Sequence, residues 1–103
     1  MSADVDSARL EWEGGYRDFS TAMRDPAAAD ALGRQLRAVT DELRRRVGGT
    51  FTLGELAGEY AAAERWVRDV LAEQAAPGWP RTLSLVEGAA FHLYSRGAVD
   101  FTP

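Results

Sequence analysis

The only histidine of the chain, His92, is the first residue whose side chain could do chemistry. It lies in a predicted helix, with Glu87 five residues before it and Tyr94 two residues after it. An imidazole within reach of a carboxylate is a common pairing for general acid–base catalysis. We therefore treat His92, Tyr94 and Glu87 as a candidate ligand pocket. The alternative interpretation is a half-buried histidine that hydrogen-bonds to a backbone carbonyl or a carboxylate.

The absence of two residue types excludes several other kinds of site. The chain contains no cysteine, and all 12 of its basic residues are arginine. Disulfides, thiol catalysis and cysteine-ligated zinc are thereby excluded, as are Schiff-base lysines and the lysine of a phosphate-binding loop. A single histidine is also a poor basis for a metal centre. We expect no metal and no cofactor, and the sequence favours a protein that is not an enzyme.

Five arginines lie on the predicted second helix and raise the possibility of an anion site. They alternate with acidic residues at a spacing of four, which favours ion pairs along an exposed helix face. The predicted pairs are Asp30–Arg34, Arg37–Asp41, Asp41–Arg45 and Glu42–Arg46. A solvated face is the simpler interpretation, and an enzyme or binder of an anionic ligand is the alternative.

The segment 52–71 carries the one resemblance to a DNA-binding motif. Residues 52–57 read Thr-Leu-Gly-Glu-Leu-Ala, and Val67 and Val70 follow at the spacing of a second helix core. This segment resembles the helix-turn-helix of lac-repressor-type regulators. The resemblance implies a transcriptional regulator with a turn near residues 61–63, where the sequence reads Ala-Ala-Ala and favours a continuous helix.

The aromatic residues suggest a different function, which is binding to another protein. Trp66 lies at the edge of the apolar stripe of the predicted third helix, between Arg65 and Arg68. Tryptophan and arginine are enriched in protein interfaces. We expect a non-enzymatic, regulatory or accessory interaction module that contacts a protein partner or a second copy of itself through these three residues.

Composition limits the surroundings in which the protein works. The chain has 103 residues, of which 46% are hydrophobic and 27% are charged, as in one small globular domain. Its net charge of −4 and pI of about 4.9 make nucleic acid an unfavoured partner. The acidic N-terminus lacks the features of a signal peptide, and no apolar run is long enough to span a membrane. We expect a cytoplasmic protein with no membrane association.

The elements that position these residues are four predicted helices. Apolar periodicity and end signals place them at about 7–24, 26–47, 52–76 and 81–96, within a single domain over 1–103. Asp25-Pro26 starts the second helix, and Thr52 with Glu55 forms a capping box for the third. Gly14-Gly15 leaves the continuity of the first helix open. The sequence predicts an all-α, four-helix bundle-like domain with short connections and an extended C-terminal tail.

Overall fold

The described part of the chain forms four helices, which confirms the predicted all-α fold class. The computed structural model describes residues 2–73 and 79–96, with side chains for residues 5–72 and 82–96. The helices are α1 (Ser2–Ala22), α2 (Pro26–Val47), α3 (Leu53–Glu73) and α4 (Trp79–Ser95). The predicted break at residues 77–78 and the predicted extended tail lie outside the described residues.

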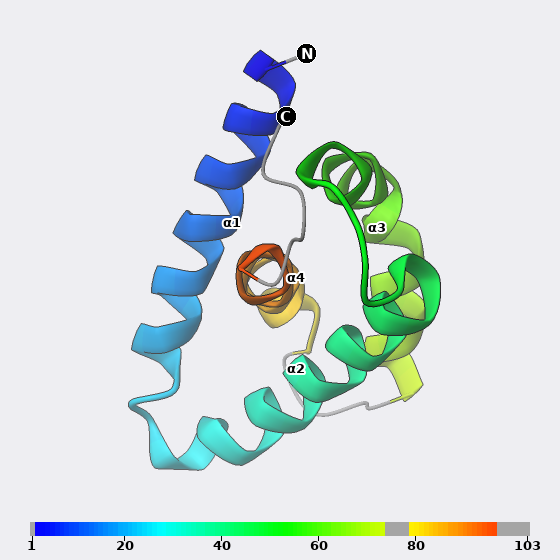
Figure 1. The fold of residues 1–103 in the computed structure, drawn as a ribbon. Helices are drawn as coiled ribbons and strands as arrows, with labels where there is room; N and C mark the ends of the chain where they lie inside the picture. The colour runs from blue at the N-terminus through cyan, green and yellow to red at the C-terminus, as the bar shows by residue number, and fades with distance from the viewer. Residues whose placement is uncertain (1, 74–78, 97–103) are drawn as a thin grey trace.

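Helix α4 occupies the centre of the molecule, and the other three helices surround it (Figure 1). Its residues Val86, Ala89, Ala90 and Phe91 have no solvent-exposed surface. Figure 1 shows α2 turning away from the end of α1 instead of running back beside it. The fold is thus an irregular variant of the bundle, because α1, α2 and α3 each pack mainly on α4 rather than in a regular antiparallel order.

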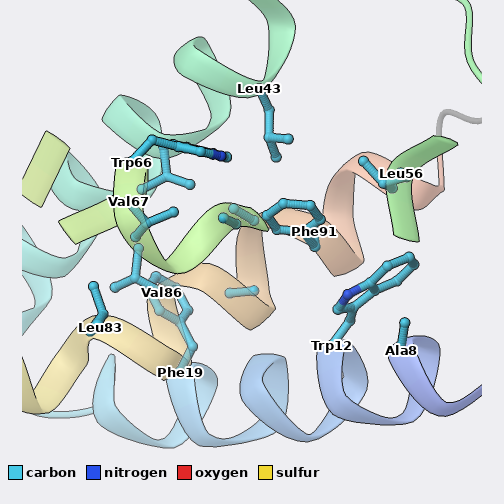
Figure 2. Packing of buried hydrophobic residues seen from close by; sticks show 14 of the residues in the cluster. Ala8, Trp12, Phe19, Leu43, Leu56, Trp66, Val67, Leu83, Val86 and Phe91 are labelled. Carbon is cyan, nitrogen blue, oxygen red and sulfur yellow. The ribbon is translucent and has the colours of Figure 1, made fainter. Parts of the chain in front are cut away.

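Aromatic side chains make up the middle of the core. Figure 2 shows Phe91 of α4 between Trp12 of α1 and Trp66 of α3. The ring centroid of Phe91 lies 5.9 Å from that of Trp12, 6.3 Å from that of Trp66 and 4.9 Å from that of Tyr60. Burial of a side chain of this size stabilises a fold by about 1.5–3 kcal/mol. Phe91 therefore joins the helices that flank α4 into one core.

Helix α1 is continuous through Gly14-Gly15, and a close helix crossing explains Gly15. A Cβ atom on Gly15 would lie 2.8 Å from the Cα atom of Gly88, and one on Gly88 would lie 2.9 Å from the Cα atom of Gly15. The two glycines let the backbones of α1 and α4 approach closely. Packing against α4 thus offsets the low helix propensity of glycine. The helix also begins at Ser2 rather than near the predicted residue 7.

The predicted helix ends are formed as their sequences indicate. Oδ1 of Asp25 accepts a hydrogen bond of 3.0 Å from the backbone N–H of Ala27. In the capping box, the Glu55 N–H donates to the Thr52 hydroxyl at 3.1 Å, and the Thr52 N–H donates to the Glu55 carboxylate at 2.8 Å. Gly48 ends α2 with a φ of +87°, a conformation that favours glycine. These caps fix where α2 and α3 meet.

Candidate functional site

A cavity of about 850 Å³ lies between α1 and α3. Small side chains on one face of α3 leave this space open. They recur at the spacing of a helix face and are Gly54, Ala57, Gly58 and Ala61. Val5 and Ala8 of α1 line the opposite wall. We call this cavity the α1–α3 groove.

Glu87 of the central helix α4 also lines the groove. Its side chain is buried, with only 8% of the residue exposed. No hydrogen bond or ion pair within the described residues reaches its carboxylate. Its oxygens are not fully enclosed, so water in the groove still reaches them. A carboxylate that is so little exposed and has no protein donor is nevertheless unfavourable, because its charge is only partly solvated. Glu87 is therefore the residue of the groove that most needs a structural or functional explanation.

Two further carboxylates line the groove with Glu87 and make it acidic. Glu11 of α1 and Glu64 of α3 line the groove, together with Tyr60, whose hydroxyl donates to the Glu11 carboxylate at 3.3 Å. Burial raises the pKa of Glu87 to about 7, and the charges of Glu64 and Glu11 raise it further. Burial and the charges of Glu87 and Glu11 also raise the pKa of Tyr60. The groove can thus hold a proton near neutral pH or accept a cation.

The residues of the predicted ligand pocket lie in three different surroundings. The half-buried His92 ring stacks on Tyr16, with 4.7 Å between the ring centroids, and lines a second cavity of about 200 Å³ with Arg9 and Arg96. The hydroxyl of Tyr94 donates to the carbonyl of Gly48 at 2.9 Å. Glu87 lines the α1–α3 groove instead. The structure does not bring the three side chains together.

The three residues of the predicted contact surface lie in different environments, with Trp66 in the core and Arg65 and Arg68 on the surface. Trp66 is 7% exposed, and the guanidinium carbon of Arg46 lies 4.9 Å from the centre of its ring. The indole therefore belongs to the core rather than to an accessible contact surface. Arg65 and Arg68 are exposed, and Arg68 forms an ion pair of 3.3 Å with Glu64. The position of Trp66 at the edge of the apolar stripe of α3 was therefore not enough to tell whether its side chain lies in the core or on the surface.

The helix-turn-helix that the resemblance to lac-repressor-type regulators implies over residues 52–71 is not formed. Helix α3 is continuous from Leu53 to Glu73, so no turn interrupts residues 61–63. Three consecutive alanines favour helix at the position where the motif needs a break. Without the turn, residues 64–71 cannot be presented as a separate recognition helix.

The arginines of α2 form an exposed row of ion pairs, as the spacing predicted. Arg34 pairs with Asp30 at 2.7 Å, and Arg46 pairs with Glu42 at 2.8 Å. Two other pairs differ from the prediction, because Asp41 contacts Arg44 and Glu42 contacts Arg45, both at a spacing of three residues. Exposed pairs of this kind contribute little to stability. The row is therefore a solvated helix face.

Comparisons with other proteins do not identify a function. Searches of protein-family models, curated proteins and solved structures found no match to this chain. Within the described residues, no helix combines the length and apolar character needed to cross a bilayer. The same residues contain no cluster of three metal-binding side chains.

Sequence reasoning missed the α1–α3 groove, although one signal for it is present. Gly54, Ala57, Gly58 and Ala61 occur at positions i, i+3, i+4 and i+7, which places four small residues on one face of α3. Such a face either packs closely on another helix or leaves a groove. Which of the two occurs depends on the path of α1, which the sequence of α3 does not contain.

Proposed function

We propose that this protein is a non-enzymatic interaction module and that a protein partner binds in the α1–α3 groove. The observation that carries the proposal is Glu87, a buried carboxylate that lines an 850 Å³ cavity and has no partner within the described residues. Buried polar groups are normally satisfied by hydrogen bonds. A partner that fills the groove would supply the missing donor.

The composition of the groove supports binding rather than catalysis. A carboxyl group with a raised pKa is also typical of a general acid. However, His92 lies in the other cavity, and the described groove residues include no arginine that could stabilise a developing negative charge. The Tyr60 hydroxyl is already engaged with Glu11. The groove therefore offers a place to bind and little with which to react.

A groove-blocking variant tests this proposal. A Cβ atom built on Gly58 meets nothing within 4 Å, so Gly58→Trp places an indole in the groove without a backbone clash. The matched control is Gly33→Trp on α2, where the nearest atom to a new Cβ is the flexible end of Arg37 at 3.9 Å. Wild type and both variants are used to capture proteins from the native lysate after nuclease treatment.

We expect a reproducible partner to be retained by wild type and Gly33→Trp and to be lost from Gly58→Trp. Equal recovery by all three proteins would contradict binding in the groove. If wild type binds only itself, sedimentation of wild type and Gly58→Trp decides whether the partner is a second copy. Recovery of no partner together with a monomeric protein would contradict the proposal as a whole.

Binding of a small anion in the second cavity is a weaker candidate function. Arg9 and Arg96 line this cavity with His92, and neither arginine forms an ion pair within the described residues. Glu13, which shares the cavity, faces Arg17 at 3.9 Å. Titration with inorganic phosphate, followed through the NMR signals of the His92 ring, tests this candidate. Signals that do not move at millimolar phosphate would exclude it.

A further inference from the structure

We infer that the group entering the α1–α3 groove is the guanidinium of an arginine on a protein partner, and that it pairs with Glu87. This inference rests on the proposed function and specifies its chemistry. It is drawn from three features of the groove, namely its charge, its buried carboxylate and the shape of its α3 wall.

The charge of the groove selects a cation. Glu11, Glu64 and Glu87 approach the cavity from three different helices, and no basic side chain is among its described lining residues. An anionic group would add repulsion. Glu64 already pairs with Arg68, and Glu11 accepts a hydrogen bond from Tyr60, so a neutral group would leave Glu87 as the carboxylate without a counter-charge. The net charge of −4 adds a long-range attraction for a basic segment.

The buried carboxylate fixes where the cation binds. Glu87 is 8% exposed, whereas Glu11 and Glu64 lie on exposed positions at the rim. Exposed carboxylates are satisfied by water, so the gain from a bound donor is largest at Glu87. The groups that face Glu87 are Glu11 from α1 and Tyr60 and Glu64 from α3. Their negative or neutral charge favours a proton or a cation at this position.

The shape of the groove favours a side chain that is carried on a peptide. Gly54, Ala57, Gly58 and Ala61 let a second backbone approach α3 closely, because none of them extends beyond Cβ. The guanidinium of arginine is planar and weakly hydrated, and it packs against aromatic rings such as that of Tyr60. Lysine carries a compact and strongly hydrated charge, which is harder to transfer to a buried carboxylate. We therefore assign arginine, rather than lysine, to the group that pairs with Glu87.

Capped arginine tests the chemistry independently of any natural partner. N-acetyl-arginine methylamide is titrated into the ¹⁵N-labelled protein, and the amide signals of residues 54–61 report on the groove. The matched probe is the citrulline analogue, which has nearly the same shape without the charge. We expect saturable shifts with capped arginine and at least tenfold weaker binding of the citrulline analogue. Equal binding of the two probes would overturn the inference.

The pH dependence and a Glu87 variant identify the carboxylate. Because the pKa of Glu87 is about 7, its ionised fraction rises about tenfold between pH 6 and pH 8, and capped arginine should bind about tenfold more tightly at pH 8. Glu87→Gln should remove this dependence and weaken binding at pH 8, whereas Asp18→Asn, on an exposed position of α1, should change neither. Amide spectra of both variants confirm that they are folded. Unchanged binding by Glu87→Gln would overturn the assignment.

Further measurements separate this inference from the proposed function. If capped arginine does not bind while Gly58→Trp still loses its protein partner, the groove is the binding site and the arginine assignment is wrong. If Gly58→Trp keeps the partner, the proposed function is wrong whatever capped arginine does. Spermidine that binds more tightly than capped arginine, with no arginine-bearing protein captured, would assign the groove to a free polyamine and contradict a peptide ligand.

Discussion

At the residue scale, Glu87 couples the stability of the free protein to pH. Its pKa of about 7 in the folded state exceeds the ordinary glutamate value of 4.5, so between these values the folded protein binds more protons than the unfolded chain. The contribution of Glu87 to stability is therefore fully present below pH 4.5 and is lost as the pH rises through 7. We expect the free energy of unfolding of Glu87→Gln to fall by about 2 kcal/mol less than that of wild type between pH 4.5 and pH 7. Urea denaturation at several pH values measures this difference.

The control for this prediction is a carboxylate with no described partner at an exposed position. Asp18→Asn on α1 should keep the pH profile of the wild-type protein. Glu42 acts in the opposite direction, because hydrogen bonds from Arg45 lower its pKa, and it is unchanged in both variants. Profiles of wild type and Glu87→Gln that run parallel from pH 4.5 to pH 7 would show that Glu87 ionises as an exposed carboxylate does.

A second residue-scale prediction separates two adjacent glycines of α1. Gly15→Ala places a Cβ atom 2.8 Å from the Cα atom of Gly88, which forces α1 and α4 apart and should lower the free energy of unfolding by about 1–3 kcal/mol. At Gly14 the nearest atom is the flexible end of Arg17 at 4.0 Å, so Gly14→Ala should raise that free energy by up to about 1 kcal/mol. Chemical denaturation measures both. Equal effects of the two variants would mean that the crossing is not tight.

At the element scale, the capping box determines where α3 begins. Removing the Thr52 hydroxyl leaves the Glu55 N–H without its acceptor, so Thr52→Ala should lower the free energy of unfolding by about 1 kcal/mol. The matched control is Thr40→Ala, since Thr40 lies inside α2 and its hydroxyl donates to the Arg37 carbonyl. Alanine has the higher helix propensity there, and Thr40→Ala should be neutral or slightly stabilising. Thermal denaturation of the two variants provides the comparison.

The elements also show what the sequence can and cannot predict. Asp25-Pro26 and the Thr52–Glu55 box act within one helical turn, and both helix starts are found where they were predicted. The role of Gly15 depends on Gly88, which is 73 positions away along the chain, so the sequence left the continuity of α1 open. Glu87 was assigned to a pocket with His92 because both lie on α4, and only the positions of α1 and α3 show that it lines a different cavity.

The dependence on helix packing also explains why the burial of Trp66 could not be predicted from the sequence. Its place at the edge of the α3 stripe was compatible with a surface contact, and nothing within α3 indicated otherwise. Arg46 of α2 and Phe91 of α4 cover the indole, and the packing of these helices on α3 is a tertiary property. Local signals thus predict the helices and their ends, whereas the candidate site results from helix packing.

At the scale of the whole molecule, the central position of α4 makes the fold depend on one helix. Phe91 contacts the aromatic rings of Trp12, Tyr60 and Trp66, which belong to α1 and α3. A fold in which three helices share one central neighbour should unfold in a single cooperative transition, because no pair of outer helices keeps a core after α4 is lost. Far-UV circular dichroism and tryptophan fluorescence should therefore report the same midpoint in urea.

Phe91→Ala tests this dependence. Loss of the fully buried ring should lower the free energy of unfolding by about 3–5 kcal/mol. The control is Leu10→Ala, because Leu10 is 69% exposed and its truncation should change stability by less than about 0.5 kcal/mol. If Phe91→Ala instead loses tryptophan fluorescence at low urea while keeping its helical signal, the outer helices are stable without the centre of the core. The groove, whose two walls are joined through α4, would then have no fixed width in the absence of its ligand.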